Sequence, residues 1–378
     1  MKKTLFYIAM ALAVGSCVYP YEVELGNEVQ DALVIDANIL LGTKSTVTVS
    51  RLQPLNVGSV VPTVGVEKNI STATVYLEDD ASARYNATYK DGKYTIPAFP
   101  YMPDGGSERQ YRLTVELNGK VYRSSWITPE EAPVIKDISF VPTQDEIIVT
   151  LDAEDKGSGH GYAAVSVEEI WRFHAEYARM YIFDPDSLTI TALFGPDLSR
   201  YWCWKKEVSP KQSTVVYSDK DGHINAYPVF SFLRANNRNH DKYELRMKVW
   251  NLDEEQYKYR KLLEENGQVG TNLFYPEPGD LVGNLSCETN PSEKVYGYVN
   301  VSKVTVKDVQ WKSTYKKMGA LTPLMEAKPS AYLTMYNNGY YPIDNFINSK
   351  GENVLGWGQA RCFDCTADGG TLEKPSFE

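Results

Sequence analysis

The sequence contains little histidine and lacks the common catalytic motifs. Four histidines occur among 378 residues, and no two have the spacing that places metal ligands on one helix face. The zinc-protease motif H-E-x-x-H, the nucleophile elbow G-x-S-x-G and a glycine-rich phosphate loop are also missing. We therefore expect no metal site, no cofactor and no enzyme activity.

Positive charge is also scarce. The chain has 39 Lys and Arg against 49 Asp and Glu, a formal net charge of −10 at pH 7. An acidic chain repels nucleic acid and anionic lipid, so we exclude both as partners. Beyond the first residues no apolar run reaches the roughly 18 residues of a membrane helix.

The first 17 residues predict export and a lipid anchor. Two lysines precede the apolar run from Leu5 to Val14, and Gly15-Ser16-Cys17 follows it. This order is typical of a lipoprotein signal, in which cleavage precedes the cysteine and a lipid is attached to its thiol. The alternative is an ordinary secretory signal with an incidental cysteine. We expect a signal peptide at residues 1–16, lipidation of Cys17 and an acidic tether at residues 17–30.

Four cysteines follow the anchor. They are Cys203, Cys287, Cys362 and Cys365. Outside the cytoplasm four cysteines indicate disulfides, with three possible connectivities. A zinc site and free thiols are the alternatives, but only one CxxC pair occurs, and a redox motif lacks its usual βαβ context.

Residues 31–130 predict a β-sandwich of the immunoglobulin-like or transthyretin-like kind. Valines alternate in Thr46–Ser50, and Tyr111–Leu117 alternates apolar and polar residues. Asp91-Gly92 and Asn118-Gly119 supply the turn chemistry of two-residue hairpins. Residues 53–69 predict a long loop that is mobile or faces a partner.

Residues 131–378 predict a larger β-rich domain with one well-defined helix. The run Tyr162–Phe183 fits both the helix period and the strand period. We predict a strand because β-branched and aromatic residues dominate the run. The helix is expected from an Asp253 cap with Gln256 as its capping-box partner to Gly267. We expect the C-terminal tail to be held by a disulfide. The predicted fold class of the whole chain is mostly β.

Three further features could carry function. Tyr201, Trp202 and Trp204 form the densest aromatic cluster, which is either core packing beside a disulfide or a platform for a ligand or partner. Asp186-Ser187-Leu188 fits a short O-glycosylation pattern, which makes Ser187 a candidate site. Adjacent acids such as Glu168-Glu169 and Asp79-Asp80 are interpreted as solvated faces.

Several spread motifs carry a family resemblance. They are Glu168-Glu169-Ile170-Trp171-Arg172-Phe173-His174, Cys203-Trp204, Pro278–Asn284, Asn290–Glu293, Val295–Tyr298, Cys362-Phe363-Asp364-Cys365, Gly369-Gly370-Thr371 and Lys374–Phe377. In these the mature chain resembles the Bacteroidetes lipoproteins of domain-of-unknown-function family 4249. The resemblance implies a strand at residues 162–183, a domain boundary near Pro129 and, by association only, a role beside a TonB-dependent transporter. It implies no catalytic residues.

The sequence therefore favours a non-catalytic protein of the outer membrane, held by the lipid on Cys17 at the cell surface or the periplasmic face. Its expected work is ligand capture for nutrient uptake with a TonB-dependent transporter. The ligand would be a glycan, a peptide or another small molecule. The alternative is a structural or adhesive surface lipoprotein of the fimbrial-anchor type. A hydrolase with dispersed carboxylates is the class favoured least.

Overall fold

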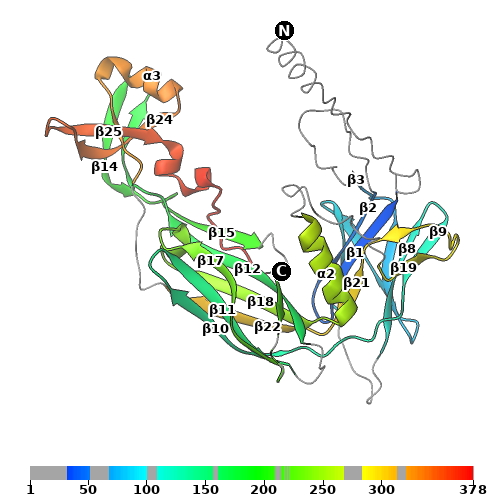
Figure 1. The fold of residues 1–378 in the computed structure, drawn as a ribbon. Coiled ribbons are helices and arrows are strands. Elements are labelled where there is room, and N and C mark those ends of the chain that lie inside the picture. Colours follow the sequence, from blue (N-terminus) through cyan, green and yellow to red (C-terminus); the bar gives the residue numbers. More distant parts are fainter. Residues whose placement is uncertain are drawn as a thin grey trace, which may run out of the picture.

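The structure of the chain is a computed structural model. It describes residues 32–51, 68–99, 109–155, 161–208, 214–217, 219, 221–267, 283–312 and 321–377. The predicted signal peptide, Cys17, the tether and most of the predicted loop at residues 53–69 lie outside these ranges. Within them the fold is mostly β, as predicted, and forms two sandwiches followed by a small head (Figure 1).

Two sheets face each other in the first sandwich, one of them antiparallel throughout and the other mixed. One has the order β20 (Val295–Tyr296), β1 (Leu33–Leu40), β2 (Ser45–Arg51), β7 (Lys93–Ile96), β6 (Thr88–Lys90), with β21 (Val299–Ser302) beside β1 and β3 (Lys68–Asn69) beside β2. The other has the order β19 (Leu285–Cys287), β9 (Lys120–Ser124), β8 (Tyr111–Leu117), β4 (Thr74–Asp79), β5 (Arg84–Asn86). Alternating apolar residues of both sheets form one core.

Both predicted hairpin turns are confirmed. Asp91 and Gly92 have φ of 52° and 83°, and Lys90 pairs with Lys93 across the turn. Asn118-Gly119 joins β8 to β9 in the same way. Because both central residues need positive φ, Asn-Gly and Asp-Gly identify such turns from sequence.

One segment corrects the predicted domains. Residues 285–302 were assigned to the second domain, but β20 and β21 pair in parallel with β1, and β19 pairs with β9. The physical reason is the close approach that glycine allows. A Cβ on Gly297 would lie 1.9 Å from the Ile35 carbonyl oxygen, and a Cβ on Gly283 would lie 1.5 Å from the Gly297 carbonyl oxygen. Only glycine lets this segment approach β1, so residues 285–302 complete the first sandwich.

The second sandwich also has two sheets. The smaller has the order β10 (Val134–Pro142), β11 (Glu146–Glu154), β17 (His223–Leu233). The larger has the order β15 (Trp202–Val208), β12 (Tyr162–His174), β18 (Tyr243–Asn251), β22 (Thr305–Trp311), with β16 (Thr214–Tyr217) also beside β12. The predicted strand at residues 162–183 is confirmed over residues 162–174 as β12; residues 175–178 interrupt it, and the strand that follows from residue 179 belongs to another sheet.

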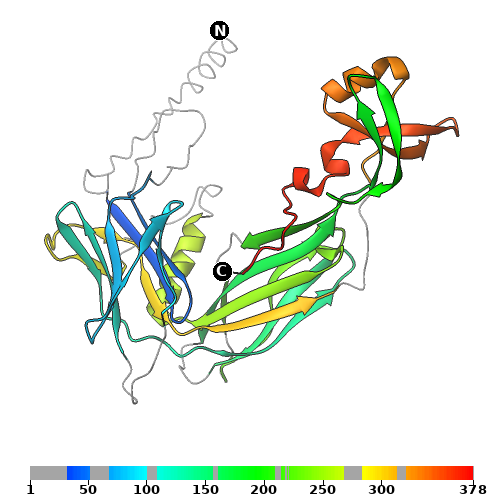
Figure 2. The ribbon, with the colours of Figure 1, turned by 180° about the vertical axis from the view of Figure 1, so that it is seen from behind.

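The head rises from one end of the second sandwich (Figure 2). It contains the hairpin β13 (Arg179–Asp184) and β14 (Thr189–Asp197), the sheet β23 (Met325–Glu326), β25 (Asn353–Gln359), β24 (Tyr340–Ile347), and helix α3 (Tyr332–Asn337) with the 3₁₀ turn η3 (Pro329–Ala331). Phe183 packs against Tyr336 and Trp357 at its centre. The sequence did not predict this separate unit.

The predicted helix is α2 (Glu254–Gly267). The Gln256 N–H donates to Asp253 Oδ1 at 2.7 Å, which is the predicted cap. The Gln256 side chain does not complete the capping box; its Nε2 donates to Asn300 of the first sandwich at 2.7 Å.

The two sandwiches are in contact near this helix. Leu40 of β1 packs with Trp250 and Leu252 in a shared apolar cluster, so this region joins the two sandwiches. No helix among the described residues is long and apolar enough to cross a membrane.

Three of the four adjacent acids are buried, which corrects their interpretation as solvated faces, whereas Asp80 is exposed. Glu168 and Glu169 are only 6% and 3% exposed, and they point to opposite faces of β12 because neighbouring strand residues alternate. Glu169 accepts hydrogen bonds from Arg238 Nε at 2.7 Å and from the Tyr243 hydroxyl at 2.5 Å. Asp79 is likewise buried and pairs with Arg109 at 2.8 Å. These carboxylates stabilise the sandwiches by ion pairing.

Candidate functional site

The predicted aromatic cluster lies at the neck between the second sandwich and the head. Trp202 and Trp204 share one face of β15 and are half-buried, whereas Cys203 between them points into the core. Tyr201 precedes the strand and stacks on His174, with ring centroids 5.1 Å apart. The three predicted residues are therefore brought together.

Cations of the same chain lie over both indole rings. Arg172 pairs across from Trp204 in the sheet, 4.8 Å from the Trp202 ring centroid and 6.0 Å from that of Trp204. Its charge is paired with Asp241. Lys374 of the tail lies 5.4 Å from the Trp204 ring. Cation–π contact thus connects the cluster to the C-terminal tail.

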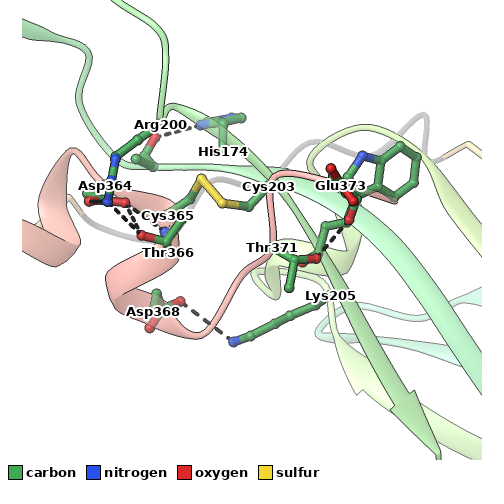
Figure 3. The surroundings of a disulfide bond; sticks show 12 residues. His174, Arg200, Cys203, Lys205, Asp364, Cys365, Thr366, Asp368, Thr371 and Glu373 are labelled. Atoms are coloured by element: carbon green, nitrogen blue, oxygen red, sulfur yellow. Dashed lines mark hydrogen bonds and ion pairs between the residues drawn. A yellow bond between two sulfur atoms is a disulfide. The ribbon is translucent and has the colours of Figure 1, made fainter. Parts of the chain in front are cut away.

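Of the four cysteines, two form a disulfide. Cys203 of β15 is bonded to Cys365, which begins the 3₁₀ turn η5 (Cys365–Asp368), with a Cα–Cα distance of 5.7 Å (Figure 3). Cys287 and Cys362 are buried free thiols, which corrects the expectation that all four would pair. The reason is separation: Cys287 belongs to the core of the first sandwich and Cys362 to that of the head.

Beyond the disulfide, the tail runs along β15. The Trp204 N–H donates to Thr371 O at 2.7 Å, and the Thr371 N–H donates back to Trp204 O at 2.8 Å. A Cβ on Gly370 would lie 2.5 Å from Cys203 Cβ, so glycine is needed where the tail crosses the disulfide. Lys374 pairs with Glu244 at 2.7 Å, and Phe377 lies under Arg246 at 4.7 Å. The tail is therefore fixed to the outer face of the sheet.

Charged groups reinforce the turn around Cys365. Burial alone would raise the pKa of Asp364, but hydrogen bonds from Thr366 and the Arg200 ion pair at 3.0 Å lower it below its ordinary value. Lys205 lies 3.8 Å from Asp368 on the other side of the disulfide (Figure 3). The turn is thus held from both sides.

Two hollows flank this region. The first, which we call the neck cavity, has a volume of about 330 Å³, and its lining includes His174, Asn237, His240, Thr322 and Arg361. His174 stacks on His240 with ring centroids 4.4 Å apart, and its Nδ1 lies 2.7 Å from Ala175 O. Since a carbonyl accepts only, Nδ1 carries the proton and Nε2 of the neutral ring is an acceptor.

The second hollow, the tail groove, has a volume of about 750 Å³. It lies between the tail, strand β15 and the 3₁₀ turn η1 (Asn237–Asn239). Its lining includes Trp171, Trp204, Lys205, Lys206, Glu207, Asn236, Arg238 and Thr371. Among these only Trp204 was predicted as a binding residue, whereas Trp171 and Thr371 belonged to the motifs of the family resemblance. Tail residues 369–371 are distant from β15 in the sequence, and no local sequence pattern indicates that they lie beside it.

The structure describes one of the two predicted modification sites. Ser187 lies in the exposed turn between β13 and β14, where its hydroxyl is 2.7 Å from Asp184 Oδ2 and 2.8 Å from Thr189 Oγ1. It remains a candidate for O-glycosylation. Cys17 lies outside the described residues. No group of three or more His, Cys, Asp or Glu among the described residues could hold a metal ion.

A family model described as "Domain of unknown function (DUF4249)" matches residues 18–308. The chain belongs to this family. The match confirms the resemblance seen in the sequence. It covers the first sandwich, α2, the hairpin of the head and β15, and it ends within β22. The tail motifs of this DUF4249 protein, from Cys362 to Phe377, lie outside the match. No curated protein matches the chain.

Proposed function

We propose that this DUF4249 protein is a non-catalytic ligand-capture protein, anchored in the outer membrane by a lipid on Cys17 and working beside a TonB-dependent transporter. The observation that carries the proposal is the pair of hollows beside the disulfide. Their volumes, about 330 and 750 Å³, suit small-molecule or oligomeric ligands. Asn237 lines both hollows.

The covalent link would preorganise a binding site at this position. The Cys203–Cys365 bond fixes the tail against β15 before any ligand arrives. A preformed site loses less conformational entropy on binding than a mobile one. A membrane anchor adds to this, since it holds even a weak binder close to a transporter in the same plane.

The test is pull-down from the native membrane with the full chain, followed by mass spectrometry. Recovery of a barrel transporter in amounts comparable to the bait supports the proposal. Metabolic labelling with palmitate should mark the wild type and not Cys17→Ser. A glycan and peptide array read for both binding and turnover separates capture from hydrolysis; ligand turnover would overturn the non-catalytic assignment.

A second candidate, an adhesive or structural role, is favoured by one observation. Phe194 of β14 is fully exposed, at 116% of its reference area, and Ile182, Leu188 and Ile347 of the head are also exposed. Such side chains, where they form one contiguous patch, are typical of protein–protein contacts. Recovery of a pilin-like polymer instead of a transporter in the same pull-down would favour adhesion.

A further inference from the structure

Strand β14 of the head has one edge open for pairing with another chain (Figure 1). It pairs with β13 on one side, and no strand in the described part of the chain pairs with its other side. In an antiparallel pair every second residue directs its N–H and C=O away from the partner strand. The open side of β14 therefore presents a row of backbone donors and acceptors that a further strand can bind.

This edge lacks the residues that usually protect an open strand. The stretch Thr189–Gly195, which reads Thr-Ile-Thr-Ala-Leu-Phe-Gly, contains no charged residue and no proline. Among the described strands, the other edge strands of seven or more residues each contain a lysine or a proline: Lys136 of β10, Lys205 and Lys206 of β15, Pro228 of β17, Lys307 of β22 and Pro342 of β24. Lysine and proline on an edge oppose pairing with another chain. The edge of β14 is the long one without this protection.

An aromatic side chain of β14 stands free in solvent. The register with β13 shifts after Ala192, so the residues that follow bulge away from β13. Phe194 lies in this bulge and is fully exposed, which means that its ring packs against no described part of the chain. Another molecule that covers Phe194 removes this apolar surface from water, which is favourable.

The occupant that fits this edge is β14 of a second copy. The chain carries a formal charge of −10, so two copies repel each other, and an uncharged edge is where they can approach without opposing like charges. Antiparallel pairing about a two-fold axis at Ala192 places Ile190 of each copy opposite Phe194 of the other. Pairs of an aromatic and a β-branched residue stabilise sheets. We propose that two copies of the chain associate through their β14 strands and join their β13–β14 hairpins into one continuous sheet. This association goes beyond the ligand-capture function and does not depend on it.

The test is disulfide crosslinking of the full chain in its native membrane. Ala192→Cys places a thiol on the two-fold axis, where the introduced cysteines of two copies face each other, whereas the native thiols of Cys287 and Cys362 are buried. Copper phenanthroline as the oxidant should convert this variant to a homodimer that is visible on a gel without reductant. Gln310→Cys, an exposed position on the edge strand β22, measures random collision and should give roughly tenfold less homodimer.

A second pair of variants tests the edge itself. Phe194→Lys, added to Ala192→Cys, removes the apolar pair and supplies the charge that protects other edges, so it should lower the homodimer yield about tenfold. Gln310→Lys, added to Ala192→Cys, is the matched control and should leave the yield unchanged. Both positions are exposed, so thermal unfolding should be the same in all variants.

Three results would overturn the proposed pairing. They are a homodimer yield from Ala192→Cys no higher than from Gln310→Cys, a yield that Phe194→Lys leaves unchanged, and a mixed disulfide with a different polypeptide in place of the homodimer. Recovery of a transporter in the pull-down is a separate measurement, so failure of the pairing would leave the capture function standing.

Discussion

Cys203 of β15 and Cys365 of η5 are 162 residues apart in the sequence and covalently joined in the fold. The closed loop contains α2, the segment that completes the first sandwich and most of the head. Both cysteines lie in the core of the second sandwich. The bond therefore links the end of the chain to the edge of the larger sheet and defines the neck at which both hollows lie.

Removing this bond should destabilise the protein. The double variant Cys203→Ser and Cys365→Ser should lose about 2–4 kcal/mol of unfolding free energy, since the unfolded chain regains the freedom of a long loop. Denaturant unfolding with and without reductant measures this loss. Reductant should weaken the wild type and leave the double variant unchanged. Equal stability of oxidised and reduced wild type would contradict the structural role of the bond.

The two free thiols should be unreactive in the folded protein. Burial, followed by the nearby Glu176 carboxylate, raises the pKa of Cys362, so little thiolate forms near neutral pH. Cys287 is also buried, and its Sγ lies 3.4 Å from Thr289 Oγ1. Iodoacetamide labelling followed by peptide mass spectrometry should modify both only after denaturation. Rapid labelling of either residue in the native protein would show that its core opens readily.

The buried ion pair at Glu169 should matter far more than an exposed pair. Arg238→Ala leaves the Glu169 carboxylate buried without its cation and should cost about 3–5 kcal/mol of unfolding free energy. Asp308→Asn removes half of the exposed Arg246–Asp308 pair on β22 and should cost less than about 1 kcal/mol. Thermal and denaturant unfolding of both variants give the comparison. Equal costs would mean that Glu169 reaches solvent.

Local patterns predicted the local features. Asn118-Gly119 defined its hairpin, Asp253 capped α2, and alternation placed Leu113 and Val115 in the core. These features depend on residues within a few positions of one another. The family resemblance was also visible, because its motifs are local strings.

Long-range pairing could not be predicted in this way. Val299 pairs with Ala37, and Thr371 pairs with Trp204, 167 positions away in the sequence. Hydrophobic periodicity does not indicate which distant strand a segment will join. Glycines 283, 297 and 370 mark these contacts, but a sequence alone does not distinguish close approach from a turn. The disulfide pairing and the tail groove depend on the same long-range contacts, so the site was recognised only through its aromatic residues.

Asp364 should make stability fall in acid. Its pKa is lowered in the folded protein by the Thr366 hydrogen bonds and the Arg200 ion pair, against the effect of burial. Its stabilising contribution is therefore complete above the unfolded value of about 3.9 and is lost as pH falls through the folded pKa. The wild type should exceed Asp364→Asn in unfolding free energy at pH 7, and the gap should narrow below pH 4. A gap independent of pH would exclude this linkage.

Gly297 should tolerate no side chain, because it sets the approach of the returning segment to β1. Its φ is +105°, and an added Cβ would lie 1.9 Å from the Ile35 carbonyl oxygen, a backbone atom that cannot rotate away. Gly297→Ala should therefore cost at least about 2 kcal/mol through backbone strain and displaced strands. Gly195→Ala, where the Cβ meets open space, should stay within about 0.5 kcal/mol of the wild type.

Hydrogen exchange shows whether Gly297→Ala loses stability at the pairing between β1 and the returning segment. The Ala37 N–H donates to Tyr298 O at 3.0 Å, and the Leu41 N–H donates to Ser302 O at 2.9 Å. Both amides should exchange faster in Gly297→Ala, while amides of β11 in the second sandwich should keep their protection. If the Ala37 amide stayed protected while the protein lost stability, residues 285–302 would not depend on Gly297 for their pairing with β1. Faster exchange confined to Ala37 and Leu41 would instead identify this parallel contact as the element that completes the first sandwich.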